Sequence, residues 1–162
     1  MEIERKFKVK RLPEGLERYE KKKIEQGYLC SGPIVRIRRS NDNYILTYKS
    51  KKQNGEDDAA IINEEVELPL TEQAYLHLKD KADNNMIEKT RYIIPLEKGL
   101  KAELDIFEGK LSGLYFVEVE FPDEETSKSF NPPDWFAEDV SFDKRYRNNY
   151  LSKVNSYDEL GI

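Results

Sequence analysis

Cysteine and histidine are almost absent from this chain of 162 residues, in which Cys30 and His77 are the only ones. A single cysteine cannot form an intrachain disulfide. A single histidine removes most zinc sites and argues against a Ser-His-Asp triad. His77 lies in the helical-looking stretch 71–83, where we expect a surface or packing role. Any metal ion that this protein uses must therefore be bound by oxygen atoms.

Long apolar runs and a glycine-rich phosphate loop are also missing. No segment approaches membrane-spanning length, and the chain opens with charged residues, so we expect a cytoplasmic protein without membrane contacts. The net charge of -5 gives no general basic field, which argues against nucleic-acid binding. Without a Walker-type loop, phosphate groups would have to be bound by side chains on strands.

The composition nevertheless favours a folded protein. Charged residues make up 36% of the chain, a share that leans toward disorder. Ten tyrosines and seven phenylalanines, set in regular alternation with polar residues, argue the other way. No linker divides the chain, so we expect one domain, residues 1–162, large enough for a hydrophobic core.

Alternating polar and apolar residues predict eight strands, because successive side chains of a strand point to opposite faces. The expected strands are residues 2–9, 26–30, 35–39, 44–51, 61–68, 86–94, 100–107 and 115–121. A short helix is expected after Pro13, and Thr71 can cap a second helix. We expect polar loops at 52–58, the most mobile segment, and at 123–129.

The last part of the chain predicts helical structure. Residues 132–135 suit a short helical turn, and Ser141 can cap a final helix. On that helix four apolar residues recur at intervals of four, which predicts a buried stripe: Phe142, Tyr146, Tyr150 and Val154.

Charges are sorted by sign on the polar faces of the predicted strands. The acids are Glu2, Glu4, Glu65, Glu67, Glu103, Asp105, Glu118 and Glu120, and the bases are Lys6, Lys8, Arg36, Arg38, Lys49, Lys89 and Arg91. Like charges two residues apart repel, and nothing on an exposed sheet repays that cost. An open sheet with a wet outer face and a barrel with a wet interior share one hydrophobic pattern. The sorting of charge favours the barrel, with its apolar outer face covered by helices.

Eight carboxylates in one cavity cannot all stay ionised without cations. All-oxygen ligation selects Mg²⁺ or Mn²⁺, as one or two ions. Eight acids and seven bases sum to -1, so two divalent ions would bring the cavity to +3. A linear triphosphate, with a charge of roughly -4, would fit such a site, gripped by arginine forks and lysine ammonium groups.

The order of short motifs matches a known family. Glu2-Ile3-Glu4-Arg5-Lys6 has a Glu-x-Glu-x-Lys pattern, and further motifs follow: Gln26-Gly27-Tyr28-Leu29, Val35-Arg36-Ile37-Arg38, Thr47-Tyr48-Lys49, Glu65-Val66-Glu67, Lys89-Thr90-Arg91-Tyr92, Glu103-Leu104-Asp105 and Val117-Glu118-Val119-Glu120. Nearly the whole chain thus resembles the CYTH domain, part of the triphosphate tunnel metalloenzyme superfamily. Asp143-Lys144-Arg145-Tyr146 followed by Asn149 looks like the C-terminal helix of its short bacterial members.

The resemblance implies an α+β fold, in which an eight-stranded antiparallel barrel forms a hydrophilic tunnel for triphosphate and metal. It implies that Glu2 and Glu4, with Glu118 or Glu120, hold the catalytic metal. Glu65, Glu67 and Asp105 would bind a second metal or orient the attacking water, completing a catalytic set with Glu4. The implied phosphate-binding residues are Lys6, Arg36, Arg38, Lys49, Lys89 and Arg91, with Arg145 reaching the tunnel mouth. Lys8 and Glu103 would be further lining residues.

Three functions remain open at this point. The first is a metal-dependent triphosphatase that hydrolyses inorganic tripolyphosphate or a similar small triphosphate, favoured because no extra domain is available to bind a large organic group. The second is a class IV-type adenylate cyclase, although no aromatic cluster specifies adenine. The third is a non-catalytic module that binds polyphosphate or nucleotide. The sequence does not indicate an oligomeric state.

Overall fold

Nine strands and three short α-helices account for most of the regular structure in the described residues, which are 1–51 and 60–162 of a computed structural model. The predicted loop 52–58 lies outside them. The strands are β1 (Glu2–Val9), β2 (Glu20–Ser31), β3 (Ile34–Ser40), β4 (Asn43–Lys51), β5 (Ile61–Pro69), β6 (Asp83–Pro95), β7 (Lys101–Phe107), β8 (Tyr115–Glu120) and β9 (Phe136–Asp139). The helices are α1 (Glu72–Lys79), α2 (Glu124–Ser129) and α3 (Asn148–Leu151), with 3₁₀ turns at Leu16–Arg18, Glu97–Gly99, Gly109–Leu111, Lys144–Tyr146 and Tyr157–Leu160.

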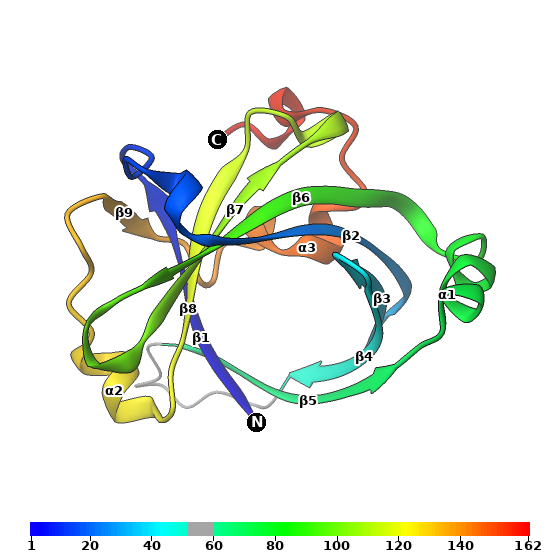
Figure 1. The fold of residues 1–162 in the computed structure, drawn as a ribbon, viewed down its shortest axis with the longest axis horizontal. Coiled ribbons are helices and arrows are strands. Elements are labelled where there is room, and N and C mark those ends of the chain that lie inside the picture. Colours follow the sequence, from blue (N-terminus) through cyan, green and yellow to red (C-terminus); the bar gives the residue numbers. More distant parts are fainter. Residues whose placement is uncertain (52–59) are drawn as a thin grey trace.

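The strands follow the order β5-β4-β3-β2-β6-β7-β8-β1-β9, and every pairing is antiparallel. An additional pairing of β5 with β1 joins the first eight strands into a closed ring, and β9 extends the sheet beside β1 (Figure 1). The predicted eight-stranded antiparallel barrel is thereby confirmed.

The register of the strands gathers the charged residues on the inner face. Three inner-face pairs join opposite charges: Lys49 with Glu65, Arg91 with Asp105, and Lys6 with Glu118. Directly opposite residues have Cβ atoms only about 4.5–5.5 Å apart, so these pairs offset the repulsion between like charges along each strand.

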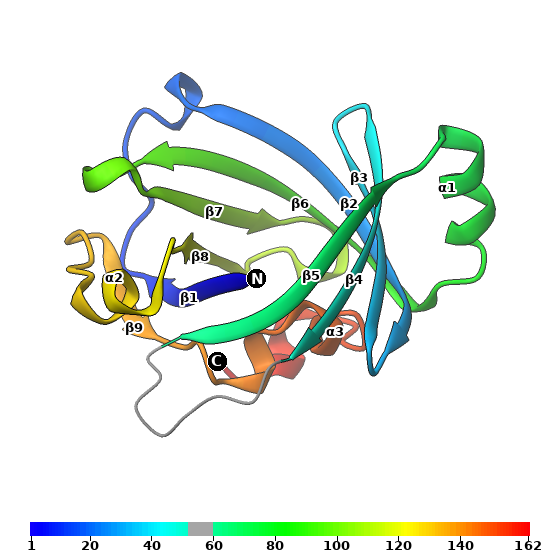
Figure 2. The same ribbon diagram turned by 90° about the horizontal axis from the view of Figure 1, so that it is seen from below.

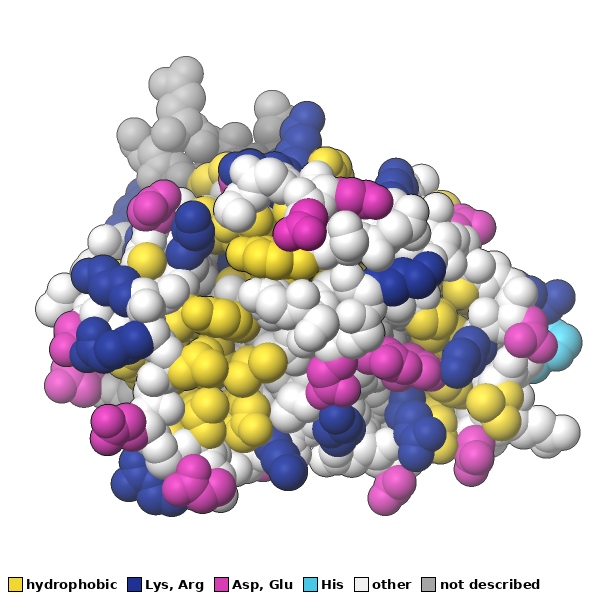
Figure 3. Space-filling view, turned by 90° about the horizontal axis from the view of Figure 1, so that it is seen from above, with side chains coloured by type: hydrophobic (Ala, Val, Ile, Leu, Met, Phe, Trp, Pro, Cys, Tyr) yellow, Lys and Arg dark blue, Asp and Glu magenta, His cyan; other side chains and the backbone are white. Residues whose placement is uncertain are grey.

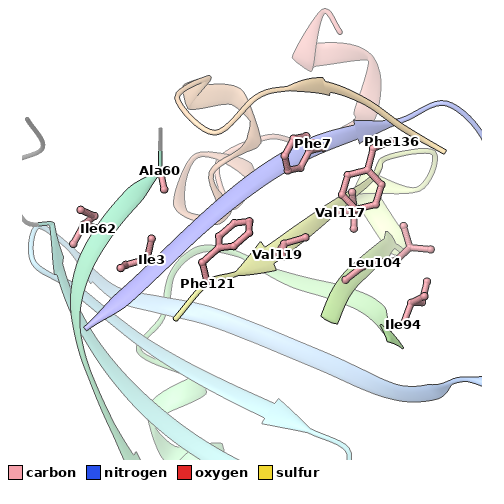
Figure 4. Packing of buried hydrophobic residues seen from close by; sticks show 11 residues of the cluster. Ile3, Phe7, Ala60, Ile62, Ile94, Leu104, Val117, Val119, Phe121 and Phe136 are labelled. Carbon is pink, nitrogen blue, oxygen red and sulfur yellow. The ribbon is translucent and has the colours of Figure 1, made fainter. Parts of the chain in front are cut away.

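A hydrophobic cluster covers the outside of the barrel near β1. Ile3 and Phe7 of β1 pack with Val119 of β8 and with Phe136, which begins β9 (Figure 4). Phe130, which follows α2, packs against Phe7 and Phe136. Arg5 of β1 links the covering segments α2 and β9 to the barrel. Its guanidinium donates to Asp139 Oδ2 at 2.9 and 3.0 Å and to the carbonyl of Ser127 at 2.8 Å. Burying one such phenylalanine contributes about 1.5–3 kcal/mol.

A second hydrophobic cluster fills one end of the barrel interior. Phe107 and Phe116 point inward by the same alternation as Asp105 and Glu118, and they pack with Tyr28 and Ile87. Segments near the C-terminus complete the cluster with Tyr146, Leu151, Val154 and Leu160. The interior is therefore charged over only part of its length, whereas the sequence pattern predicted a charged face throughout.

Helices cover the apolar outer face only in part. α1 packs on β3 and β4 through the buried Tyr75, while His77 on the same helix is exposed. Tyr48, Val66 and Leu68 on β4 and β5 remain 41%, 54% and 55% exposed. Seen from above, apolar side chains also reach the surface between charged ones (Figure 3). In the described part of the chain, no helix combines the length and apolar character that crossing a membrane requires.

Several local predictions near the ends of the chain are wrong. β2 begins at Glu20, six residues before the expected start, and the helix expected after Pro13 is one 3₁₀ turn. Residues 124–129 form α2 instead of a loop, because Asp123 accepts a hydrogen bond from the Thr126 amide and caps it. Residues 132–135 form no helix, and the strand β9 that follows them was not predicted.

The final helix is also shorter than predicted. A 3₁₀ turn and the four-residue α3 replace it, so Tyr146 and Val154 are buried but Phe142 and Tyr150 are 49% and 41% exposed. Ser141 does not cap this helix, because its hydroxyl accepts a hydrogen bond from the Lys6 amide at 2.9 Å. Packing against the barrel end thus overrides the helical period.

Candidate functional site

A cavity of about 640 Å³ lies inside the barrel. Residues of strands β1 to β8 and of the start of α3 line this cavity, and most of the lining side chains are charged. Asp105 and Phe107 of β7 are not among the residues that line the cavity. Its carboxylates are Glu2, Glu4, Glu65, Glu67, Glu103, Glu118 and Glu120, and its cations are Lys6, Arg36, Arg38, Lys49, Lys51, Arg91 and Arg147.

Lys49 lies between carboxylates from two other strands. Its Nζ atom is 2.8 Å from Glu2 Oε1 and 3.5 Å from Glu65 Oε2. Glu2 Oε1 also accepts a hydrogen bond from Asn63 at 3.2 Å. Burial alone would lower the pKa of Lys49, but the nearby Glu4 and Glu2 carboxylates raise that pKa above its usual range. The lysine is therefore a permanent positive charge among the carboxylates of Glu2, Glu4 and Glu65, which together with Glu118 and Glu120 we call the acidic wall.

The carboxylate of Glu4 makes no hydrogen bond or ion pair with another described residue. Burial raises the pKa of Glu4 well above its usual value, and the negative charges of Glu118 and Glu2 raise it further. Burial also raises the pKa of Glu120, again with a contribution from Glu2. This part of the cavity lining holds negative charge that its described neighbours do not neutralise.

Glu118 is in the opposite situation because two cations face it. Its Oε1 atom lies 4.0 Å from Lys6 Nζ and 3.9 Å from an Arg91 nitrogen. Burial would raise the pKa of Glu118, but Lys6 and Arg91 lower it to about 2. Lys6 is itself held by the Tyr146 carbonyl and lies 4.5 Å from the centre of the Phe116 ring.

Lys89, Asp105 and Arg91 form a buried ion network. Lys89 Nζ is 2.7 Å from Asp105 Oδ2, and the side chains of Lys89 and Asp105 are both 0% exposed. Arg91 donates to Asp105 Oδ1 at 2.7 Å and to Oδ2 at 2.9 Å, and it contacts Glu103 at 2.6 Å. Burial would raise the pKa of Asp105, but the two cations lower it below its usual range. Burial lowers the pKa of Lys89 to about 7, although Asp105 opposes that change.

Arg36 and Arg38 on β3 have neutral partners. Arg36 donates to Thr47 Oγ1 at 3.2 Å, and Arg38 donates to Gln26 Oε1 at 2.8 Å. Neither forms an ion pair with a described carboxylate, and the buried Nε of Arg36 has no hydrogen-bond partner. Burial lowers the pKa of Arg38 to about 9, with contributions from Arg36 and Arg91. Both guanidinium groups are thus cations that a bound anion can neutralise.

The acidic wall fits a divalent cation by its chemistry. Within residues 1–51 and 60–162 no three acidic, histidine or cysteine side chains already converge as a finished metal site. However, every donor is a carboxylate oxygen, and Glu65 Oε2 and Glu118 Oε1 are buried without a hydrogen-bond partner. Such oxygen donors suit Mg²⁺ or Mn²⁺. Lys49 now contacts both Glu2 and Glu65, so an ion bound there would compete with its ammonium group for these carboxylates.

The start of α3 contributes to the lining of the cavity. Figure 2 shows α3 beside the barrel strands. Arg147, Asn148 and Asn149 line the cavity there. Arg145 was predicted to reach the tunnel mouth but lies outside the cavity, because Asp143 binds it at 2.8 and 3.1 Å and it also donates to the carbonyl of Gly161. The irregular backbone of this segment turns the later residues inward instead.

Most of the predicted site residues come together in the cavity, with four exceptions. Lys89 and Asp105 are buried and reach the cavity only through contact with Arg91, and Lys8 and Arg145 are not among the described lining residues. Sequence reasoning missed Tyr28 and Asn63, which also line the cavity. Strand alternation could have found both, because they share the inner face with Gln26 and Glu65.

Comparisons with known proteins agree with this architecture. The family model of the CYTH domain matches residues 1–157. An inorganic triphosphatase of Nitrosomonas europaea is 36% identical over 154 residues, covering 93% of this chain and 96% of that protein. An inorganic triphosphatase of Acetivibrio thermocellus is 34% identical over 159 residues, covering 94% and 93%.

Solved structures give the same result. The crystal structure of an inorganic triphosphatase superimposes with a TM-score of 0.67 at 35% identity and covers 94% of each chain. The motifs, the closed barrel and these similarities agree, and the chain belongs to the CYTH domain family.

Proposed function

We propose that this protein is a divalent-metal-dependent inorganic triphosphatase that hydrolyses tripolyphosphate, or a similarly small triphosphate, inside the barrel. One observation carries the proposal: a single cavity is lined both by Glu4, whose carboxylate has no described ion-pair partner, and by Arg36 and Arg38, whose guanidinium groups have no described carboxylate partner. The activity named for the relatives supports it, since the matches span nearly the whole chain. Residues 1–162 would act as one domain.

The acidic wall would hold one or two ions of Mg²⁺ or Mn²⁺. In this proposal Glu2 and Glu4, with Glu118 or Glu120, bind the ion, and Glu65 and Glu67 orient the attacking water. When bound, a divalent ion supplies positive charge that polarises phosphoryl oxygens.

The cations of the cavity would bind the phosphate groups. Arg36, Arg38 and Arg91 present guanidinium forks to phosphate oxygens, and Lys6 and Lys49 add point charges. As the bond to the leaving diphosphate breaks, these cations stabilise the charge that develops on it. Asp105 has both oxygens engaged, so we assign it the role of positioning Lys89 and Arg91.

Phosphate release from tripolyphosphate tests the proposal directly. We expect release with Mg²⁺ or Mn²⁺ and none after chelation with EDTA. Tight binding without turnover would favour the binding module, and formation of cyclic AMP from ATP would favour the cyclase. A cytoplasmic location is part of the same proposal, and cell fractionation would test it.

A further inference from the structure

Among the described residues that line the cavity, one cation is not explained by the strand pattern. Arg147 lies between the 3₁₀ turn Lys144–Tyr146 and α3, outside the barrel strands, yet it lines the cavity. Its side chain makes no hydrogen bond or ion pair with a described residue. Lys6, Lys49 and Arg91, in contrast, each contact a carboxylate.

Two lysines of the barrel contact the residues on either side of Arg147. Lys6 donates a hydrogen bond to the carbonyl of Tyr146, and Lys89 Nζ lies 3.5 Å from Asn148 Oδ1. Tyr146 and Leu151 are 2% and 1% exposed within the hydrophobic cluster that fills the barrel end. The segment is therefore anchored by buried contacts before and after the arginine.

An arginine in this position suits an anion. A partly buried guanidinium offers five N–H donors and keeps its charge at any physiological pH. Arg36 and Arg38 on β3 share with Arg147 the absence of a described carboxylate partner. The three guanidinium groups are therefore lining cations that the described carboxylates leave unneutralised.

The geometry points to Arg147 as a substrate-binding residue that holds the phosphate at the α3 end of a linear triphosphate. This inference rests on the proposed function for the identity of the anion. Arg147 contacts neither the acidic wall nor the predicted water-orienting residues Glu65 and Glu67, so its role is binding and not bond cleavage. Arg145, two residues earlier, is neutralised by Asp143 and provides a matched control.

The test compares Arg147→Gln, Arg147→Lys and Arg145→Gln with the wild type. We expect Arg147→Gln to raise the KM for tripolyphosphate about tenfold, the usual effect of losing a charge-assisted hydrogen bond, with kcat changed less than about threefold. Arg147→Lys should recover part of the loss because it keeps the charge. Arg145→Gln should leave KM unchanged, and thermal melting should show that all three variants are folded.

A second measurement separates this inference from the proposed activity. Isothermal titration of tripolyphosphate into the metal-free proteins, in EDTA, reports binding without turnover. If the wild type binds but does not hydrolyse, the proposed function fails, and weaker binding by Arg147→Gln still supports the inference. Equal KM and equal affinity for Arg147→Gln and wild type would overturn it, as would equal losses in Arg145→Gln. Absence of both binding and turnover in the wild type would overturn both proposals.

Discussion

The substitution Asp105→Asn tests the buried ion network most directly. Among the described residues it removes the only charge that both Lys89 and Arg91 contact within 3 Å, and it leaves these two basic groups without that carboxylate in a site where the Lys89 and Asp105 side chains are 0% exposed. Removing one partner of a buried pair typically costs about 3–5 kcal/mol, because the remaining charge stays desolvated without compensation. We therefore expect the free energy of unfolding to fall by about that amount.

The assay is urea and thermal unfolding of the metal-free protein. For a chain of this size, 1 kcal/mol shifts Tm by about 2–4 °C, so the melting temperature should fall by about 6–20 °C. Glu67→Gln is the control, because Glu67 is exposed and its replacement should change stability by less than about 0.5 kcal/mol. Manganese titration completes the comparison, since a positioning role for Asp105 predicts an unchanged affinity for the ion.

Two results would refute this reasoning. An Asp105→Asn variant that melts within about 2 °C of the wild type would show that the network contributes little to stability. A variant that stays stable but loses Mn²⁺ binding would show that Asp105 is a metal ligand, as the family resemblance implied.

Three further predictions concern the acidic wall. Glu4→Gln should abolish turnover and weaken Mn²⁺ binding, but it should leave the metal-free protein at least as stable near neutral pH. The pKa of Glu4 is raised in the folded state, so its ionisation opposes folding as pH rises. Full activity of the variant, or a lower Tm, would contradict this prediction. Lys49→Ala should weaken tripolyphosphate binding about tenfold by calorimetry, and an unchanged affinity would exclude Lys49 from the phosphate site. Metal binding should weaken as pH falls toward the raised pKa values of Glu2, Glu4 and Glu120, starting above the usual glutamate value of about 4.3, and a flat Mn²⁺ titration from pH 5 to 8 would argue against these ligands.

Strand alternation predicted most of the charged lining, and the sorting of charge together with the family resemblance predicted the barrel. Residues such as Arg36 and Arg38 or Glu65 and Glu67 stand two apart, so each pair must share a face, and the cost of their repulsion indicated an interior. Alternation does not say how far along the barrel axis the charged region extends. Phe107 follows Asp105 on the same face, and only packing against the C-terminal segments identifies it as part of a hydrophobic end.

The C-terminal region shows a second limit. A spacing of four residues predicts a helix stripe only if the helix is continuous, and here a 3₁₀ turn ends at Tyr146 and Arg147 has an extended backbone before α3 begins. Because of this interruption Arg147 lines the cavity, whereas Arg145, which was predicted to reach it, lies outside. Similarly, Glu103 and Asp105 look equivalent in sequence, but the depth of each depends on neighbouring strands that local pattern does not reveal.

Among the described residues, the pairing that closes the barrel is also the shortest one in the ring. Between described residues β1 and β5 share only three residue pairs, Glu2 with Asn63, Ile3 with Ile62 and Glu4 with Ile61, whereas β4 and β5 share seven. Amide hydrogens at this junction should therefore exchange faster than those elsewhere in the ring. Glu2 and Glu4 lie on β1 and Glu65 lies on β5, so a cation bound by all three would hold the two strands together. Loading the protein with metal should therefore slow amide hydrogen exchange at this junction before it slows exchange elsewhere.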